Sequence, residues 1–418
     1  MQADESDLSR VDTHGSQRAE RADRMNDSGP SRSTSGAPAR YRLFTPGPLT
    51  TSDTVREAAG VDLGSRSAPA AELTAWLRGA IERIAGCGNR YSAIPLQGSG
   101  TFAIEAMLCS LLDDGDHVLI VENGAYSQRM TEICRIHGIR HSVLALDHQR
   151  RFDLSDVEAA LLRHGDVTHM AAVHFETALG VLNDIDGLGR LGKRHGCRLL
   201  VDAISTFGAY PIDFSSGCIA AVALSSNKCL HGLPGLAFVV ADTMALARRR
   251  TPRTLSLDLS AQHRMFETGQ QWRFTPPLQA MLALRQAIRE FDAAGGQPAR
   301  RRRYERLAAR LLQEMERIGF APVIDAAHRA PIITTFAPRA GSHCAFATLN
   351  DFLFERGLVI YPTRHRNPDS FRVGVIGELT PDDIDDLLRA LAAFTTRSPS
   401  SARTAECDMV AAGQESAP

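Results

Sequence analysis

The sequence predicts an α/β fold, with a large domain built on a mostly parallel sheet and a small C-terminal α+β domain. In the middle of the chain, short apolar runs alternate with longer amphipathic stretches, the pattern of parallel strands joined by helical crossovers. The runs are almost continuously hydrophobic, as expected for strands buried on both faces. The predicted strands are His117–Val121, His169–His174, Arg198–Val201, Ala220–Leu224 and Leu236–Val240.

The two ends of the 418-residue chain differ in composition from its middle. Residues 1–40 are rich in Ser, Arg, Asp, Gly and Pro and almost lack aliphatic side chains. Such a segment buries too little apolar surface to offset the entropy lost on ordering. We therefore expect disordered tails at 1–40 and 396–418. Between them we expect a large domain over 41–294, including an N-terminal segment, and a small domain over 295–395.

Helix signals lie between and after the predicted strands. A helix over Asp156–Arg163 follows Ser155 as its cap, and a helix over Asp186–His195 ends at Gly196. A longer helical pattern, Phe274–Ala294, breaks at a pair of glycines. Predicted pieces of the small domain follow: Ile332–Phe336, a helix near Ala347–Arg356, Leu358–Tyr361, Phe371–Val375, and a final helix opened by Thr380-Pro381-Asp382-Asp383.

The charge pattern excludes several classes of protein. Lys and Arg number 47 against 48 Asp and Glu, so the chain is not built mainly to coat nucleic acid or an anionic membrane. The run Arg300–Arg303 lacks interleaved aromatic residues, and we expect a solvated helix face there. No apolar run approaches the ~18 residues of a membrane span, and the polar N-terminus resembles no secretory signal.

The eight cysteines form no C-x-x-C pair, so the sequence indicates neither a zinc site nor a disulfide scaffold. Buried, reduced thiols are the simpler interpretation. We expect no bound metal and a reducing, cytoplasmic location.

The run Gln97-Gly98-Ser99-Gly100-Thr101 opens a predicted helix. Glycines allow close backbone approach, and unpaired N–H groups at a helix start attract phosphate. Ser99 and Thr101 add hydroxyl donors. The run also fits the dinucleotide pattern G-x-G-x-x-A, with Glu122 at a strand end 22 residues past Gly100. Three interpretations stay open at this point: a single phosphate, a pyrophosphate, or an ordinary tight turn.

Two further strand ends carry polar residues. Asp202 ends the apolar run Leu199–Val201, where α/β proteins place their ligands. It could bind a metal, cap the next turn, or pair with a cationic heterocycle. Lys228 follows Ala220–Leu224 and precedes a Gly/Pro-rich loop, where its amine should be partly desolvated. Desolvation lowers the pKa of a lysine, and a neutral amine forms Schiff bases.

Together these features match pyridoxal 5′-phosphate (PLP). Its phosphate needs donors, its ring nitrogen needs a carboxylate to stay protonated, and its aldehyde needs a lysine. A dinucleotide site would explain the glycine loop alone and would leave Asp202 and Lys228 without a role.

Six runs resemble the class V aminotransferases of fold type I, and within them the 2-aminoethylphosphonate–pyruvate transaminases. The resemblance covers about Tyr41 to Ala393. The runs are Thr45-Pro46-Gly47-Pro48, Gln97-Gly98-Ser99-Gly100-Thr101, Glu122-Asn123-Gly124-Ala125-Tyr126, Val201-Asp202-Ala203, Ser225-Ser226-Asn227-Lys228-Cys229 and Phe371-Arg372-Val373-Gly374.

The resemblance implies a role for each matching residue. Lys228 would bind the cofactor covalently and carry the proton between substrate and cofactor, while Asp202 would pair with the pyridine nitrogen. Arg372 would grip the substrate's acidic group with its planar fork, and Phe175 would contact the substrate. The other cofactor contacts would be Ser99, Gly100 and Thr101 at the phosphate, Thr177, Met130 as a thioether face over the ring, and Thr275. The family also implies a homodimer with active sites at the subunit interface and Thr275 supplied by the partner.

Two segments depart from the subfamily. A Ser-Glu-Thr-Thr-Thr-Gly-like run is replaced by Phe175-Glu176-Thr177-Ala178-Leu179-Gly180, and a Trp-Asp-Asp-Asp-like stretch by Asp62-Leu63-Gly64-Ser65-Arg66-Ser67. Both changes leave the PLP chemistry intact and bear on which amine enters.

The sequence therefore predicts a cytoplasmic PLP-dependent aminotransferase of phosphonate metabolism, moving an amino group between 2-aminoethylphosphonate and pyruvate. Two same-fold alternatives are a class V transaminase for another small amine, of the alanine–glyoxylate type, and a cysteine desulfurase using Cys344 on a mobile loop. The different-class alternative is an NAD-binding oxidoreductase.

Overall fold

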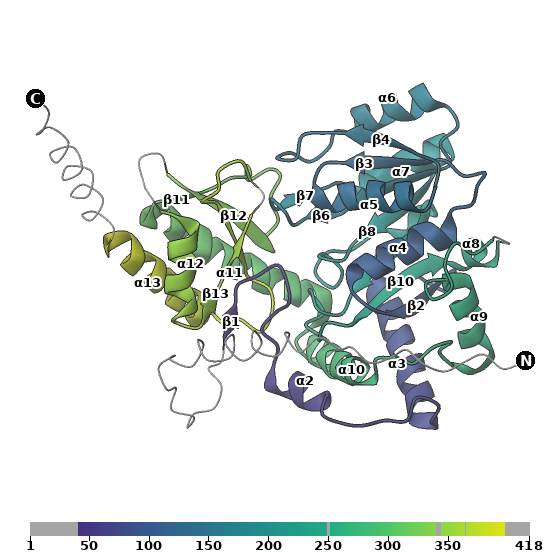
Figure 1. The fold of residues 1–418 in the computed structure, drawn as a ribbon, viewed down its shortest axis with the longest axis horizontal. Helices are drawn as coiled ribbons and strands as arrows, with labels where there is room; N and C mark the ends of the chain where they lie inside the picture. The colour runs from purple at the N-terminus through teal and green to yellow at the C-terminus, as the bar shows by residue number, and fades with distance from the viewer. Residues whose placement is uncertain (1–40, 249–250, 340–343, 364, 398–418) are drawn as a thin grey trace, which may run out of the picture. The chain divides into compact units, whose positions relative to one another are not determined.

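The computed structural model describes residues 41–248, 251–339, 344–363 and 365–397, so the predicted tail at 1–40 and most of the one at 396–418 lie outside the described residues. Thr396 and Arg397, which were predicted to belong to the C-terminal tail, instead end the last helix. Seven strands form the central sheet in the order β2-β10-β9-β8-β5-β3-β4 (Figure 1). Among them β10 alone runs antiparallel to its neighbours, which confirms the mostly parallel sheet. The strands are β2 Tyr91–Gln97, β3 Val118–Glu122, β4 His141–Ala145, β5 His169–Val173, β8 Arg198–Asp202, β9 Ile219–Ser225 and β10 Leu236–Asp242.

Five of these strands agree with the predicted ranges within two residues at each end, whereas β2 and β4 were not predicted. Both missed strands lie at the edges of the sheet. Strand β2 contains Pro95, which edge strands tolerate because one of their sides needs no N–H donor. Strand β4 is only partly buried and therefore lacks the continuous apolar run that marks the inner strands.

Helices flank this sheet, and α4 and α5 lie on the viewer's side of it in Figure 1. Helix α7 ends at Gly196 as predicted, with the glycine in the left-handed conformation. Helix α6 begins one residue before the predicted cap, so Asp153 rather than Ser155 occupies the cap position. The helices are α2 Asp53–Ala58, α3 Ala68–Ala85, α4 Gly100–Leu111, α5 Ala125–Ile136, α6 Leu154–His164, α7 Ile185–His195, α8 Thr243–Ala247, α9 Leu259–Gly269 and α10 Leu278–Ala293, with a 3-10 turn at Phe214–Ser216.

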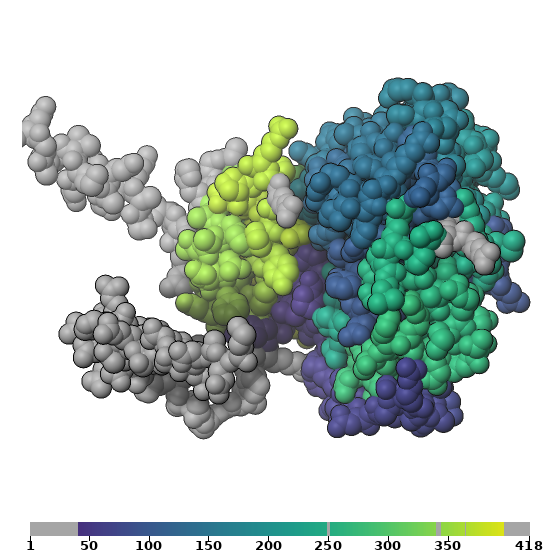
Figure 2. Space-filling view, turned by 45° about the vertical axis from the view of Figure 1, so that its right-hand side comes forward, coloured from purple at the N-terminus to yellow at the C-terminus, as the bar shows by residue number. Residues whose placement is uncertain are grey.

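The small domain is an antiparallel sheet, ordered β11-β12-β15-β14, packed with helices. Its residues (yellow-green in Figure 2) meet large-domain residues (blue) along one side. Thr380 opens the last helix as predicted, because Thr380 and Asp383 exchange side chain–backbone hydrogen bonds. The elements are α11 Gly296–Ile318, β11 Phe320–Pro322, β12 Ile333–Pro338, α12 Phe346–Phe354, β13 Leu358–Val359, β14 Tyr361–Pro362, β15 Phe371–Gly374 and α13 Pro381–Arg397.

Two details differ from expectation in this region. Strand β1, Arg42–Leu43, pairs with β13 of the small domain, whereas α2 packs on α10 of the large one, so the N-terminal segment contacts both domains. Arg300 is buried and donates to Cys229 O at 3.1 Å, so the arginine run is not wholly a solvated face. Within the described residues, no helix is both long and apolar enough to cross a membrane.

The parallel strands bring the polar residues to one edge. Asp202 is the last residue of β8, and Lys228 follows the neighbouring strand β9 by three residues. Since β2 also points toward this edge, its end delivers the glycine loop to the same place.

Candidate active site

A pocket of about 160 Å³ gathers five predicted residues that lie far apart in the sequence: Ser99, Gly100, Thr101, Asp202 and Lys228. It lies at the carboxyl edge of the central sheet, where the loops after β2, β8 and β9 meet. The remaining lining residues are Ile104, Tyr126, Arg129, Ile204, Ser225 and Asn227.

The glycine loop forms one wall of the pocket. Helix α4 begins at Gly100, and the Ser99 side chain makes no capping hydrogen bond to its first turn. Gly98 has a φ of +139°, a conformation that favours glycine. An uncapped helix start presents backbone N–H groups and the positive end of the helix dipole. With the two nearby hydroxyls, it is suited to binding a phosphate.

Asp202 forms the floor of the pocket and is only 5% exposed. Its Oδ1 accepts a hydrogen bond from the Ile204 N–H at 2.9 Å, so the capping role considered from the sequence is also present. Burial raises the pKa of Asp202 to about 6, against the opposing effects of the Ile204 N–H, Arg129 and Lys228. A cationic partner in the pocket would stabilise the ionised carboxylate further.

Lys228 reaches the pocket from the loop after β9. Its Nζ donates to Pro46 O at 2.6 Å, and a Cβ at Gly47 would stand 2.3 Å from the same nitrogen. Gly47 also has a φ of +124°, a conformation that favours glycine, so a larger residue here would be strained and would displace the amine. Burial lowers the pKa of Lys228 to about 8, and the positive charge of Arg372 acts in the same direction. The amine is thus more readily neutral, and more nucleophilic, than an ordinary lysine.

The predicted cofactor contact Met130 does not line the pocket, and the aromatic side chain of Tyr126 lies there instead. Met130 is fully buried in the hydrophobic core, whereas Tyr126, one helical turn earlier on α5, lines the pocket. Arg129 also lines it, lying over the Tyr126 ring at 5.0 Å and donating to Thr101 Oγ1 at 2.9 Å. Tyr126 belongs to one of the runs that resemble the family, but no role was predicted for it. An aromatic residue in the first turn of this helix was the available signal.

The turn from Glu176 to Gly180 lies between the large domain and the small one. Glu176 Oε2 accepts from the Tyr126 N–H at 3.0 Å, which ties the turn to α5. Its next three carbonyl groups accept hydrogen bonds from the small domain: Arg372 Nη1 to Thr177 O at 3.1 Å, Thr363 Oγ1 to Ala178 O at 2.7 Å, and Thr335 Oγ1 to Leu179 O at 2.8 Å.

Two predicted contacts do not reach the pocket. Phe175 is 2% exposed and packs into the small-domain core, and Thr177, also buried, contacts Arg372 through its backbone carbonyl. Arg372 also donates from Nε to Pro362 O at 3.0 Å, so its guanidinium is held between β14 and the Glu176–Gly180 turn and is not among the residues that line the pocket.

Comparison with known proteins identifies the family. The aminotransferase class-V family model matches residues 56–361. The chain belongs to the class-V aminotransferase family. Among the similar proteins, the 2-aminoethylphosphonate–pyruvate transaminases of Burkholderia ambifaria and Burkholderia thailandensis are each 41% identical to this aminotransferase over 84% of its length, covering 94% and 95% of theirs.

Solved structures share the fold of this aminotransferase. Alanine–glyoxylate aminotransferase from Nostoc sp. matches with a TM-score of 0.79 and 23% identity, covering 87% of this chain and 97% of its own. Pyridoxamine–pyruvate aminotransferase from Mesorhizobium loti matches with a TM-score of 0.77 and 21% identity, covering 87% and 94%. At these identities the likeness concerns the fold, and it confirms the fold type I prediction.

The aminotransferase uses PLP, as predicted, and the donor set of the pocket fits this cofactor. The helix start suits the phosphate, the buried carboxylate of Asp202 suits a protonated ring nitrogen, and the Lys228 amine suits the aldehyde. The dinucleotide alternative is therefore wrong. Glu122, the acidic residue that fitted the dinucleotide pattern, accepts a hydrogen bond from Thr131 Oγ1 at 2.9 Å.

A testable prediction follows from the lowered pKa of Lys228. Cofactor-free protein should capture PLP covalently at a rate that rises with pH to a midpoint near 8. The neutral amine is the reactive form, and burial lowers its pKa from 10.5 to about 8. Stopped-flow absorbance across pH 6–11 measures the midpoint. A midpoint near 10.5 would show that the amine is not desolvated.

Thr275 lies away from its own chain's PLP pocket. It lines a second cavity of about 370 Å³ with Gly98, Phe102, Trp272 and Phe274, among others. Phe102 and Phe274 are each about half exposed there. Gly98 belongs to both this cavity and the glycine loop, so the cavity that Thr275 lines adjoins that loop.

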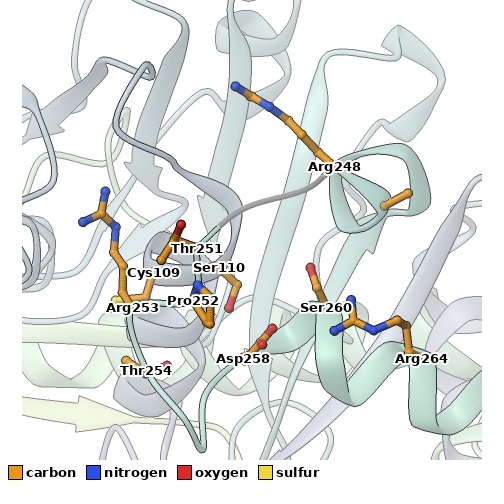
Figure 3. A pocket seen from close by; sticks show the side chains of 11 residues that line it. Cys109, Ser110, Arg248, Thr251, Pro252, Arg253, Thr254, Asp258, Ser260 and Arg264 are labelled. Atoms are coloured by element: carbon orange, nitrogen blue, oxygen red, sulfur yellow. The ribbon is translucent and has the colours of Figure 1, made fainter.

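A third cavity, of about 350 Å³, contains none of the predicted site residues (Figure 3). Its arginines look like an anion site, but two of them already have acidic partners. Arg248 pairs with Asp113 and Asp116, and Arg253 pairs with Asp114. In Figure 3 the guanidinium groups of both arginines point away from the middle of the cavity. Their role there is to hold the loop after α4.

Proposed function

We propose that this aminotransferase transfers the amino group between 2-aminoethylphosphonate and pyruvate, giving phosphonoacetaldehyde and alanine, or the reverse. The observation that carries the proposal is the convergence of Lys228, Asp202 and the glycine loop on one pocket. The positive charge of Arg372 lies near enough to contribute to the lowered pKa of Lys228. The activity named for relatives 41% identical over most of the chain supports the substrate pair.

Each residue has a separate task in this proposal. Bound PLP supplies the electron sink that stabilises negative charge at the substrate carbon. Asp202 holds a proton on the ring nitrogen through its carboxylate. Ser99, Gly100 and Thr101 would hold the phosphate, and Tyr126 would provide an aromatic contact to the cofactor. Lys228 would hold the aldehyde, and its Nζ would accept and return the proton of the substrate carbon.

Arg372 is the proposed anchor for the acidic group of the substrate. Arg372→Ala should lower kcat/KM by about 30-fold or more for both half-reactions, because one site must bind amine and keto acid in turn. Arg372→Lys should keep only part of this, since a point charge cannot reproduce a two-point contact. Steady-state kinetics for each half-reaction tests the claim. A loss confined to one half-reaction would contradict a shared anchor.

A side-by-side assay tests the substrate pair. Exchange between 2-aminoethylphosphonate and pyruvate should outrun exchange between alanine and glyoxylate by kcat/KM. If the order is reversed, the substrate proposal fails and the class V aminotransferase assignment stands.

A desulfurase mechanism is disfavoured because Cys344 is 6% exposed and burial raises the pKa of its thiol to about 11. Such a thiol is a poor nucleophile at neutral pH.

The departures from the subfamily pattern have local structural roles. Phe175 fills the small-domain core, so we infer that it shapes the substrate side indirectly. In the second segment, Ser67 caps α3 by accepting from the Ala70 N–H, and Arg66 donates to Trp272 O at 2.9 Å. Arg66 thereby holds the segment that leads to Thr275.

We further infer a homodimer in which Thr275 of one subunit contributes to the phosphate site of the other. The half-exposed Phe102 and Phe274 around Thr275 support an apolar interface at this place. Phe274→Glu should therefore shift the protein toward monomer and weaken PLP binding together, because both depend on the same contact. Analytical ultracentrifugation and PLP titration measure the two effects. Dissociation with unchanged PLP affinity would separate the interface from the site.

The seven described cysteines are all buried free thiols. This supports the proposal that the enzyme works in the reducing environment of the cytoplasm.

A further inference from the structure

His231 has an unusual backbone for its residue type. It lies three residues past Lys228, is 4% exposed, and has a φ of +62°. Its N–H donates to Lys228 O at 2.8 Å, so its own conformation closes the turn that carries the lysine. A side chain other than glycine is uncommon in the left-handed region, and such residues often mark places where the surroundings constrain the backbone.

The imidazole of His231 joins three elements. Its Nε2 accepts from the Gly377 N–H at 3.0 Å, on the loop after β15, and lies 2.7 Å from the Tyr304 hydroxyl on α11. A backbone amide can only donate, so Nε2 carries no proton and the ring is neutral, with its hydrogen on Nδ1. Nδ1 lies 3.9 Å from Glu378 Oε2. Burial, together with Arg300 and Arg303, lowers the pKa of His231 well below its usual value.

The loop after β15 also controls where the amine of Lys228 lies. Gly374 N donates to Phe44 O at 3.0 Å and Glu378 N to Thr50 O at 2.7 Å, so the loop holds the segment that contains Pro46. Pro46 O is the acceptor for Lys228 Nζ. The loop after β15 thus holds Lys228 at two points. It contacts the lysine backbone through His231 and the lysine amine through Pro46. Arg372 lies on the strand that leads into this loop.

We propose that His231 is a positioning residue, which fixes the turn carrying Lys228 relative to the small-domain loop that follows the Arg372 strand. The inference rests on the proposed role of Lys228 as the PLP-binding lysine, but not on the identity of the amine substrate. His231 touches neither substrate nor cofactor in this proposal. It acts by holding Lys228 where its amine meets the cofactor's aldehyde.

Binding of two cofactor forms distinguishes a positioning role of His231 from a general effect on protein stability. PLP and pyridoxamine 5′-phosphate share ring and phosphate, but only PLP can link to Lys228. His231→Phe keeps a ring and removes the acceptor. It should weaken PLP binding to cofactor-free protein by about tenfold while changing pyridoxamine 5′-phosphate affinity less than about twofold. His231→Gln restores an acceptor oxygen and should recover much of the loss.

His117→Phe is the matched control. His117 is also buried, and both of its ring nitrogens have partners, Asp166 and Ser142, but it lies just before β3, at the opposite edge of the sheet. This variant should lower thermal stability without changing the ratio of the two affinities. An equal loss of both affinities in His231→Phe would overturn the proposal.

A milder variant covers the case in which His231→Phe does not fold. Tyr304→Phe removes one hydroxyl and leaves the Gly377 contact in place. It should lower PLP affinity about threefold, again with little effect on pyridoxamine 5′-phosphate. An unchanged ratio in this variant would likewise overturn the proposal. Because neither measurement uses an amine substrate, failure here is distinguishable from failure of the substrate assignment.

Discussion

Replacing Lys228 with alanine is expected to abolish transamination, with a loss of more than about 10⁴-fold in kcat. The substitution removes the residue that we propose both links covalently to PLP and moves the substrate proton. The lining residues of the pocket include no other lysine, histidine or cysteine to take over that proton transfer. Borohydride reduction of the wild-type holoenzyme should fix the pyridoxyl group on Lys228, and peptide mass spectrometry locates it.

Lys193 provides a control for this experiment, since it is the chain's other lysine. It is exposed in the last turn of α7, at the opposite edge of the sheet. Lys193→Ala should keep full activity and borohydride labelling, whereas Lys228→Ala should show neither. Labelled Lys193 in the wild-type enzyme, or residual turnover in Lys228→Ala near the wild-type rate, would refute the assignment.

Asp202→Asn is expected to retain PLP and to slow kcat by about 10²- to 10³-fold, the range for loss of one electrostatic contact to developing charge. The amide can still accept from the Ile204 N–H, so the turn should survive. It cannot hold a proton on the ring nitrogen, which weakens the electron sink. PLP titration and single-turnover kinetics separate the two effects.

The pH dependence of wild type gives an independent check on Asp202. Burial raises its pKa to about 6 in the empty pocket, so its carboxylate is ionised above that pH and protonated below it. PLP binding through this contact should therefore weaken as pH falls through about 6, and Asp202→Asn should lose that dependence. Near-normal turnover in Asp202→Asn would show that this residue only caps the turn.

The inner strands and their two polar ends were predictable because burial and chemistry point in the same direction there. Continuous apolar runs marked β5, β8 and β9, and a charged residue at the end of such a run is costly unless it has a function or a partner. Lys228 and Asp202 stood out for this reason. The edge strands β2 and β4 were missed because an edge strand pairs with a neighbour on one side only. It therefore need not be a continuous apolar run without proline, which is the pattern that marks an inner strand.

Side-chain direction within an element was harder to predict than the element itself. Met130 and Tyr126 lie on the same face of α5, one turn apart, and only tertiary packing decides which of them meets the pocket. Phe175, which follows a strand that ends next to the site, was predicted to contact the substrate. Its side chain instead packs into the core of the small domain. Arg300 was predicted to lie on a solvated face because its hydrogen-bond acceptor, the carbonyl of Cys229, belongs to a distant segment of the chain.

The three small-domain hydrogen bonds to successive carbonyls of the Glu176–Gly180 turn have a consequence for the conformational ensemble. Moving the small domain away from this turn must break them together, because they share one short rigid segment. At ~1 kcal/mol net for each bond, a separated arrangement would be populated about once in 150 molecules. The closed arrangement is then the resting state, with Arg372, the proposed substrate anchor, already in place before substrate binds.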